Sequence, residues 1–556
     1  MTSILGRVLA LARSDPERPF ANVWHASRRV DAVSYGDLVA RAAGFAAGLA
    51  AGGVEPGDVV VIVVPPGAEL LSAWLAPLLA GAIPSIFPWP TEKLSPEYYD
   101  GSVSALLAIC GATALVTSRE LRPRLSGIVA GAPALRTVVE VEDFPPAGGL
   151  PDLPRALLED GEAIAILQHS SGSTGLQKGV ALSSRAVFRQ IENYGEALRV
   201  TDGDRVANWM PLYHDGGLIA GFLQPLLRGL PLSILSPIDW VHDPVLLLET
   251  ITRDRSTLCW LPNFAYNFLA AKIPERRLAG VDLSSMRAFV NTAEPVRVSS
   301  HALFLDRFGA YGLDPLALTT SYGTAENVLA MTQSDPSAPV RVDTVDRGRL
   351  LRDGEAAPVP GDHPRAAAML SSGAPIPGTR LRIVDAEFHD LPDRRVGEVL
   401  LRSDCMLTEY FRRPDLTAAA FHDGWYRTGD AGYFSAGEIF VTGRRKDLII
   451  VGGANVYPQD LEFVADGVAG VHPGRSVAFG VENERSGTED VVVLVEAEAG
   501  TDEVRVAEGV RAAIAHRSEV VARDVRVVPP MWLVKTSSGK ISRTRCREKY
   551  LKECRE

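Results

Sequence analysis

Short apolar runs recur along the first third of the chain and alternate with segments of helical periodicity. The runs have the length of single strands: "DVVVIVV" (58–64), "ATALVTS" (112–118), "RTVVEVE" (136–142) and "EAIAILQ" (162–168). Residues 35–50, "YGDLVARAAGFAAGLA", carry apolar residues at helical spacing and predict a helix. Strands that alternate with helices predict an α/β fold with parallel sheet. A chain of 556 residues is too long for one ordinary core, so we expect two or more domains.

The charge and the cysteines narrow the class of protein. A net charge of −11 argues against a nucleic-acid binder. The five cysteines are scattered, without metal or disulfide spacing, which predicts a protein of the reducing cytoplasm. The most apolar stretch, residues 59–87, is interrupted by prolines and Glu69. A membrane span would need about 20 uninterrupted apolar residues, so we expect no membrane span but a buried strand followed by a core helix.

The second half of the chain changes character. Residues 335–378 are rich in Pro, Asp, Arg and Gly and predict a loop or a small inserted element at the surface. Residues 380–403 predict antiparallel strands joined by a turn, and residues 437–453, "GEIFVTGRRKDLIIVGG", predict a strand, a charged turn and another strand. The remaining 110 or so residues form an α+β pattern.

One short stretch has the composition of an anion-binding loop. "SSGSTGLQKG" (170–179) follows the apolar run "AIAIL". Glycine lets backbone N–H groups approach an oxyanion, and hydroxyls add donors. The Walker pattern requires Ser or Thr after Gly-Lys, whereas Lys178 lies between Gln177 and Gly179, so an ordinary P-loop NTPase is disfavoured. The alternative is a flexible Ser/Gly linker. The candidate phosphate-binding residues are Ser170, Ser171, Gly172, Ser173, Thr174, Gly175 and Lys178.

Four later segments place polar residues where apolar structure would otherwise continue. In "TTSYGTAEN" (319–327), Tyr322 offers a flat face for a base, Gly323 permits close backbone approach, and Glu326 offers a carboxylate. Asp430 ends "YRTGD" (426–430) and is suited to accept from two ribose hydroxyls. The other two segments are "GRRKD" (443–447) and "KTSSGKISR" (535–543), which contains Lys540. Each segment alone is a weak signal, since an isolated Asp430 is more typical of a turn and an isolated Lys540 of a solvated charge.

Together, in this order and spacing, these segments resemble the adenylate-forming superfamily of acyl-CoA synthetases, fatty acyl-AMP ligases and related adenylation domains. The resemblance covers roughly residues 20 to 550. It implies a large N-terminal domain of several subdomains, residues 1–444, with parallel sheets and a distorted β-barrel element. It also implies a small mobile α+β domain, residues 445–556, which rotates about a hinge at Lys446 between two reaction steps.

The resemblance assigns a role to each motif. It implies that the 170–179 loop embraces the β- and γ-phosphates of ATP and that Glu326, with Thr174, holds Mg²⁺. Tyr322 would lie against adenine, and Asp430 and Arg444 would bind the ribose hydroxyls. Lys540 would reach the substrate carboxylate and the α-phosphate. Ammonium and Mg²⁺ would offset the repulsion between a carboxylate and a polyanion. Further nucleotide contacts are implied at Ala293, Glu294, Ser321, Gly323 and Thr324.

Several motifs are more similar to the fatty acyl-AMP ligase branch: "LQHSSGSTG", "PLYHDGGLIAGFLQPLLRG", "LPNFAYNF", "NTAEPVR" and "SYGTAENVLAMTQ". That branch carries an insertion where residues 335–378 lie, uses free CoA poorly, and passes the acyl group to the phosphopantetheine of a carrier protein, here expected in trans. Thr292 departs from the Gly of that branch, and Gly453-Ala454 is more typical of a CoA ligase. An acyl-CoA synthetase therefore stays open as an alternative, and a non-adenylating acyl-AMP-binding member as a weaker one.

The acyl pocket is expected from residues 209–220 and 232–268. His214, in "PLYHDGGL", matches a position near the acyl carbonyl and the thiol entrance, although a structural histidine is the alternative. Trp240, Phe264 and Tyr266 are candidate walls and are equally consistent with core aromatics. The expected substrate is a hydrophobic carboxylic acid whose length and shape these residues do not define.

Overall fold

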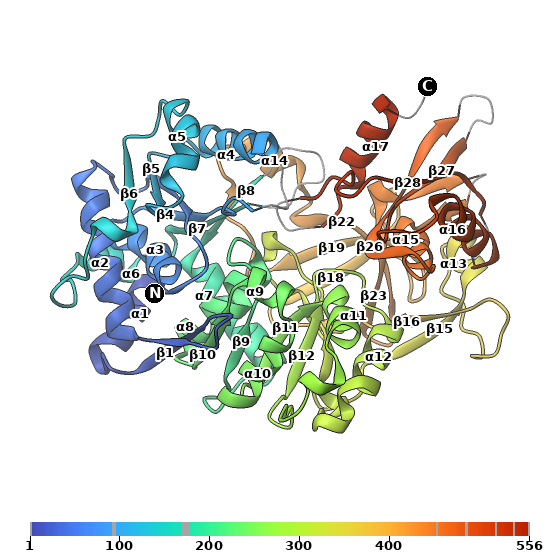
Figure 1. The fold of residues 1–556 in the computed structure, drawn as a ribbon, viewed down its shortest axis with the longest axis horizontal. Coiled ribbons are helices and arrows are strands. Elements are labelled where there is room, and N and C mark those ends of the chain that lie inside the picture. The colour runs from blue at the N-terminus through green and yellow to red at the C-terminus, as the bar shows by residue number, and fades with distance from the viewer. Residues whose placement is uncertain are drawn as a thin grey trace.

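The computed structural model describes residues 3–91, 96–169, 178–451, 454–483, 488–517, 520–536 and 540–553. At one end of the molecule lies a four-stranded parallel sheet with strand order β4-β3-β5-β6 (Figure 1). Every residue of β3 is buried, as expected for a parallel strand covered on both faces. The elements of this layer are β3 (Val59–Val63), β4 (Ile83–Ile86), β5 (Ala114–Thr117), β6 (Thr137–Glu140), α2 (Tyr35–Ala51), α3 (Ala68–Leu79), α4 (Pro96–Cys110) and α5 (Arg122–Ala130).

A seven-stranded sheet forms the centre of the molecule, with strand order β13-β12-β11-β9-β10-β1-β2. All neighbouring strands are parallel except β2, which runs antiparallel to β1. The carboxyl ends of β9 to β13 therefore lie along one edge. The strands are β1 (Pro19–Trp24), β2 (Val30–Ser34), β9 (Val206–Asn208), β10 (Leu232–Leu235), β11 (Leu258–Pro262), β12 (Ala288–Thr292) and β13 (Leu318–Thr320).

Helices connect these central strands and cover the sheet. The segment after β9 is a π-helix, η2 (Gly216–Leu223), all of whose residues are buried. The other connecting helices are α7 (Ser184–Ala197), α8 (Gln224–Arg228), α9 (Pro237–His242), α10 (Val245–Asp254), α11 (Asn263–Lys272) and α12 (Val298–Phe308).

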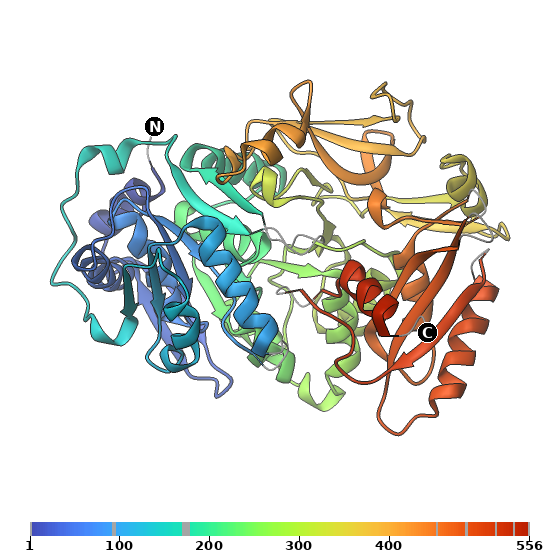
Figure 2. The ribbon, with the colours of Figure 1, turned by 90° about the horizontal axis from the view of Figure 1, so that it is seen from above.

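Antiparallel strands form a third layer, which lies above the central sheet in Figure 2. The five-stranded sheet of this layer contains β18 (Thr379–Val384), β19 (Gly397–Ser403), β21 (Phe421–His422), β22 (Trp425–Ser435) and β23 (Glu438–Arg444). A three-stranded sheet joins β7 (Ile164–His169), β8 (Gly179–Ser183) and β20 (Glu409–Tyr410). The strand expected at 162–168 thus exists, but it pairs antiparallel with β8 rather than in a parallel sheet.

Residues 335–378 form a small inserted element and not only a loop. Its strands β15 (Val342–Asp346) and β16 (Ala366–Leu370) pair antiparallel, and α13 (Arg347–Asp353) follows β15 directly. Val345 and Leu350 of the insertion pack against Tyr433 and Phe440 of the five-stranded sheet. The insertion is therefore attached to the barrel-like layer through a small core of its own.

The residues after Arg444 carry two hydrophobic clusters made only of side chains from 449 to 551. These separate cores support a boundary near residue 445, which stays a prediction. The elements are β24 (Ile449–Val451), β25 (Ala454–Val456), α15 (Pro458–Asp466), β26 (Val471–Asn483), β27 (Thr488–Ala497), α16 (Glu503–Arg517), β28 (Ala522–Val528) and α17 (Arg543–Glu553).

The α/β class with parallel sheets and a distorted barrel element is confirmed. The helix predicted at 35–50 is α2, and the apolar stretch 59–87 contains the buried strand β3 and the core helix α3. The predicted antiparallel pair is β18 and β19. Within the described ranges, no helix is long and apolar enough to cross a bilayer.

A buried carboxylate ties the barrel-like sheet to the turn that follows β23. Glu398 of β19 is 3% exposed. It accepts two hydrogen bonds from Arg427 of β22, at 3.1 and 3.0 Å, and one from Arg445 in the turn after β23. The guanidinium groups neutralise a charge that would be costly to bury alone.

Replacing Glu398 by alanine is expected to lower the free energy of unfolding by about 1–3 kcal/mol, because both arginines lose a charged partner but remain partly hydrated. Denaturant unfolding followed by circular dichroism measures the change. Asp390→Ala is the matched control: it removes an exposed carboxylate paired with Arg382 on the same sheet and should cost less than about 1 kcal/mol. Equal effects of the two substitutions would contradict a structural role for the Glu398 cluster.

Candidate active site

The candidate site residues gather where parallel strands end. Trp209 follows β9, Trp240 lies in the helix after β10, Phe264 follows β11, and Ala293 follows β12. Tyr322 comes shortly after β13. Because all these strands are parallel neighbours, their carboxyl ends bring the side chains to one edge, which is where open α/β sheets bind ligands.

Tyr322, Asp430 and Arg444 form one hydrogen-bonded and ionic group. The Tyr322 hydroxyl donates to Asp430 Oδ2 at 2.6 Å, and Arg444 Nε lies 3.4 Å from Asp430 Oδ1. Asp430 and Arg444 are directly opposite each other on β22 and β23. Burial raises the pKa of Asp430, while the Arg444 guanidinium and the Tyr322 hydroxyl oppose this shift. The group presents an aromatic ring and a carboxylate side by side, as a nucleoside site requires.

The segment after Tyr322 turns sharply and places Glu326. A Cβ on Gly323 would lie 2.0 Å from the carbonyl oxygen of Leu329, so only glycine fits there. Glu326 is 7% exposed. Its Oε1 accepts from the Tyr410 hydroxyl at 2.7 Å, and its Oε2 accepts from the Thr324 hydroxyl. The carboxylate is thus held by hydroxyls from two different elements.

Lys540 enters this edge from the far end of the sequence. Its Nζ donates to the carbonyl oxygen of Ala293 at 2.6 Å. Ala293 has φ of 69°, a left-handed conformation that costs a non-glycine residue about 1 kcal/mol. The positive charge of Lys540 also favours a lower pKa for the two residues that precede the π-helix η2, His214 and Asp215.

His214 is held neutral. Burial, assisted by the Lys540 ammonium, lowers the pKa of His214 to about 3. Its Nε2 has no hydrogen-bond partner among the residues that the structure describes. Burial raises the pKa of the neighbouring Asp215, whose Oδ1 accepts from the Gly216 amide at 2.8 Å. A neutral imidazole and a partly buried carboxyl therefore lie near the lysine.

Two further lysines belong to this region. The Lys178 ammonium lies 4.5 Å from the ring centroid of Tyr410. Burial lowers the pKa of Lys446, and the positive charges of Arg444 and Lys178 act in the same direction. Cations from three parts of the sequence thus surround the carboxylates of Asp430 and Glu326. The remainder of the predicted phosphate loop, residues 170–177, lies outside the described residues.

Three predicted contacts have partners within the protein. The Ser321 hydroxyl donates to the carbonyl oxygen of Thr332, and Glu294 Oε2 accepts from the Phe264 amide. Tyr266 is fully buried, and its hydroxyl donates to the carbonyl oxygen of Phe289. Each of these three side chains thus has a hydrogen-bond partner within the protein. Tyr266 therefore has the geometry of a core residue rather than of a pocket wall.

Aromatic residues line the edge near β9 to β11. Trp209 and Trp240 are stacked with ring centroids 3.7 Å apart, and both indole N–H groups lack an acceptor among the described residues. Phe264 stands edge-on to both rings and is 45% exposed. Trp240 itself is completely buried, so only Phe264 of the predicted walls reaches solvent.

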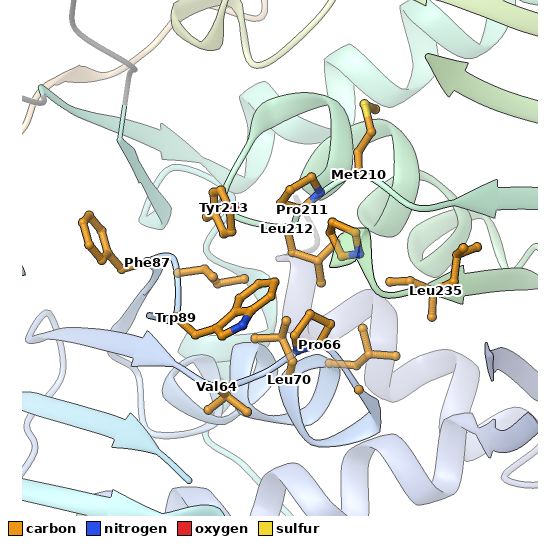
Figure 3. A pocket seen from close by; sticks show the side chains of 15 residues that line it. Val64, Pro66, Leu70, Phe87, Trp89, Met210, Pro211, Leu212, Tyr213 and Leu235 are labelled. Carbon is orange, nitrogen blue, oxygen red and sulfur yellow. The ribbon is translucent and has the colours of Figure 1, made fainter. Parts of the chain in front are cut away.

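An apolar cavity lies between the central sheet and the layer of the four-stranded sheet β4-β3-β5-β6 (Figure 3). It is lined mainly by aliphatic and aromatic side chains and is partly open to solvent. Leu70 and Trp89 lie on one side and Tyr213 and Leu235 on the other. The cavity thus adjoins His214 through Tyr213.

Sequence reasoning missed several of these residues. Asp215 follows His214 in a motif that was recognised, but its burial depends on the π-helix. Tyr410 lies 84 residues from Glu326, and no local pattern signals their contact. The cavity walls at 64–71 and 86–89 read as ordinary core. Only the apolar character of residues 59–87 pointed to this region.

Comparison with known proteins places the chain in a family. Residues 10–411 match the family model described as AMP-binding enzyme. A protein named putative acyl-CoA synthetase from Caulobacter vibrioides is 33% identical over 527 residues, which are 94% of this chain and 91% of that protein. The long-chain-fatty-acid–AMP ligase FadD32 of Mycolicibacterium smegmatis is 32% identical over 549 residues, which are 89% of this chain and 85% of that protein.

The fold is shared with solved structures. A structure from a study of fatty acyl-adenylate ligases of E. coli and L. pneumophila superposes with a TM-score of 0.90 at 27% identity, covering 99% of this chain and 98% of that one. The match to the AMP-binding family spans most of the chain, and the relatives match nearly its full length. The chain therefore belongs to the family of AMP-binding enzymes, as its motifs predict.

Proposed function

We propose that the protein activates a hydrophobic carboxylic acid with ATP, forming an acyl-adenylate and releasing pyrophosphate, and then transfers the acyl group to a phosphopantetheine thiol. The observation that carries the proposal is that Lys540 lies at the edge of the central sheet near His214 and Glu326. The names of the relatives, acyl-CoA synthetase and fatty-acid–AMP ligase, support the same chemistry.

The nucleoside is assigned to the group of Tyr322, Asp430 and Arg444. The flat ring of Tyr322 suits an adenine face, and Asp430 accepts from the ribose hydroxyls once the Tyr322 hydroxyl shares or yields its place. Burial raises the pKa of Asp430, and the positive charge of Arg444 opposes that rise. This arrangement orients the α-phosphate toward Lys540.

The acid's carboxylate oxygen attacks the α-phosphorus, and the bond from that phosphorus to pyrophosphate breaks. Two anions must approach each other, so the Lys540 ammonium, placed between Ala293 and His214, lowers the barrier by stabilising the charge on the transferred group. His214 stays neutral near pH 7 and adds no proton of its own. The lysine acts as a compact point charge that can enter and leave with the small domain.

Magnesium fits the Glu326 site. The carboxylate is buried, its two oxygens accept only hydroxyl bonds, and no ion pair with a lysine or arginine is formed within the described ranges. The described residues contain no group of three metal-binding side chains. A single carboxylate that is completed by substrate phosphates is the usual Mg²⁺ arrangement, and a bound Mg²⁺ would offset the phosphate charge. Thr174, the second predicted ligand, lies outside the described residues.

The apolar cavity is the proposed site of the acyl chain. It adjoins His214 through Tyr213 and is lined by aliphatic and aromatic side chains (Figure 3). A carboxylate beside Lys540 would direct its apolar tail toward such a lining. Part of the cavity comes from 210–213 and 234–237, within the predicted ranges, and the remainder comes from 64–71 and 86–89.

The acceptor is proposed to be a carrier protein, with free CoA as the second candidate. Arg347 of the inserted element donates to the carbonyl oxygen of Arg517 in the small domain. Such a contact disfavours rotation about Lys446, the proposed hinge, and so supports the poor use of CoA that the insertion implies. The likeness to the putative acyl-CoA synthetase favours the second candidate.

Lys540→Ala is expected to keep the fold and nucleotide binding but to slow pyrophosphate release by about a hundredfold or more, the scale of losing one strong transition-state donor. Release is measured over a panel of carboxylic acids, the same assay that tests the proposed function in the unaltered protein. Lys549→Ala is the control, because Lys549 bonds to Trp532 within the small domain. Near-normal release from the Lys540 variant would contradict its role.

Leu70→Phe is expected to fill part of the cavity and to reduce turnover of the longest acids of the panel by about tenfold relative to the shortest, since each excluded methylene costs about 1–3 kcal/mol. The measurement is the ratio of kcat/KM between acids. Leu303→Phe adds the same volume at a residue of α12 that is 45% exposed and should leave the ratio unchanged. An unchanged ratio in the Leu70 variant would place the acyl chain elsewhere.

Arg347→Ala is expected to leave acyl-adenylate formation intact and to raise the yield of acyl-CoA about fivefold, because one lost contact of about 1 kcal/mol shifts the domain equilibrium by that factor. Mass spectrometry of acyl-CoA gives the yield. Arg349→Ala is the control on the same helix, since Arg349 pairs with Glu355 inside the insertion. If the unaltered protein already makes acyl-CoA as fast as acyl-adenylate, the inserted element does not restrict the use of CoA.

A further inference from the structure

Residues 407–411, which we call the clasp, join the segment of Glu326 to the strand that follows Lys178. The Leu407 amide donates to the carbonyl oxygen of Glu326 at 2.7 Å. In the same segment, β20 pairs with β8, so that Tyr410 lies opposite Val180. Since β8 begins directly after Lys178, the clasp binds the backbone beside that lysine and the backbone beside Glu326 at the same time.

The side chain of Tyr410 also connects Glu326 with Lys178. It is 2% exposed. Its hydroxyl donates to Glu326 Oε1 at 2.7 Å and lies 3.2 Å from the hydroxyl of Tyr426. Its ring carries the Lys178 ammonium on one face, at 4.5 Å from the centroid. One rigid side chain therefore contacts an anion through its polar end and a cation through its aromatic face.

These two contacts constrain different degrees of freedom. The Glu326 carboxylate accepts from the Tyr410 hydroxyl on Oε1 and from the Thr324 hydroxyl on Oε2, so removing the Tyr410 hydroxyl takes away the bond that orients Oε1. The ring holds the ammonium of a flexible four-carbon side chain by its negative face. One tyrosine side chain thus contacts both the carboxylate and the ammonium.

We propose that Tyr410 is a positioning residue that fixes the Glu326 carboxylate and the Lys178 ammonium relative to each other, so that the triphosphate of a nucleotide with its divalent cation is held between them. This inference rests on the proposed function, because it takes Glu326 as the metal-binding carboxylate. Tyr410 itself touches neither metal nor nucleotide. Its effect is therefore confined to ligands that carry the β- and γ-phosphates.

The chain offers a matched control in Tyr433. This residue is also buried, and its hydroxyl donates to a carboxylate, Asp343 Oδ2, at 3.0 Å. It stacks on Phe440, in the core that supports the inserted element. Tyr433→Phe therefore removes a buried tyrosine–carboxylate bond of the same kind at a place with no proposed ligand.

The first experiment compares two ligands in the Tyr410→Phe variant. Calorimetric titration with ATP in the presence of Mg²⁺ is expected to show affinity about tenfold or more weaker, the effect of losing one hydrogen bond to a charged group. Titration with AMP, which lacks the β- and γ-phosphates, is expected to show unchanged affinity. Tyr433→Phe should leave both affinities unchanged. A purely structural role would lower the melting temperature without separating the two ligands.

The second experiment separates the hydroxyl from the ring. The substitution Lys178→Gln is introduced into three backgrounds: the unaltered protein, the Tyr410→Phe variant and the Tyr410→Leu variant. The loss of affinity for ATP with Mg²⁺ that it causes is expected to persist in the phenylalanine background, which keeps the aromatic face. In the leucine background, which lacks that face, the loss is expected to shrink at least severalfold. If the leucine variant fails to fold, the phenylalanine variant still decides between the outcomes below.

Two results overturn the inference: Tyr410→Phe binds ATP with Mg²⁺ as tightly as the unaltered protein, or it loses affinity for ATP and AMP equally. Either result leaves the proposed function standing if the unaltered protein releases pyrophosphate. Conversely, selective loss of ATP affinity in a protein that adenylates no acid supports the role of Tyr410 and contradicts the proposed function. An unaltered protein that does not bind ATP with Mg²⁺ overturns both.

Discussion

One hydrogen bond, from Lys540 Nζ to the carbonyl oxygen of Ala293, joins residues 247 positions apart and holds an ammonium beside His214 at the edge of the central sheet. Asp430 and Glu326 are held there by contacts of their own, so this bond adds the ammonium to side chains that are already in place. The same part of the chain contacts the start of α12, where Arg297 donates to the carbonyl oxygen of Gln459 at 3.0 Å. The placement of the residues after Arg444 therefore decides whether the ammonium reaches this edge.

The loop that accepts this bond is shaped by the layer beneath it. Asn263 Oδ1 accepts from Asn291 Nδ2 at 3.1 Å and from the Arg297 amide at 3.2 Å, so it ties the end of β12 to the start of α12. Ala293 lies between these two anchors with φ of 69°. Backbone strain of about 1–3 kcal/mol persists only where surrounding structure fixes it, and such strain is concentrated at functional sites. The buried asparagine network supplies that support.

Much of the fold followed from local patterns. The periodicity of residues 35–50 and the apolar run at 59–63 are confirmed as α2 and β3 because each pattern reports burial of its own segment. Pairing is not local: β7 has the apolar character of a parallel strand, yet it runs antiparallel to β8. The same limit explains the site. Motif residues such as Tyr322 and Asp430 were recognisable in sequence, whereas Tyr410 and the cavity wall at Trp89 depend on contacts between distant segments.

Among the described residues, arginines pair with carboxylates at two places where residues after Arg444 meet the preceding part of the chain, and these pairs differ in their exposure to water. Asp460, the partner of Arg297, has a side chain that is 60% exposed, whereas Glu398, the partner of Arg445, is almost fully enclosed. Dissolved salt screens exposed charges over about 8–10 Å but reaches enclosed pairs far less. Added salt is therefore expected to act on the two contacts unequally: it weakens the exposed ion pair of Arg297 with Asp460 while the enclosed pair of Arg445 with Glu398 persists.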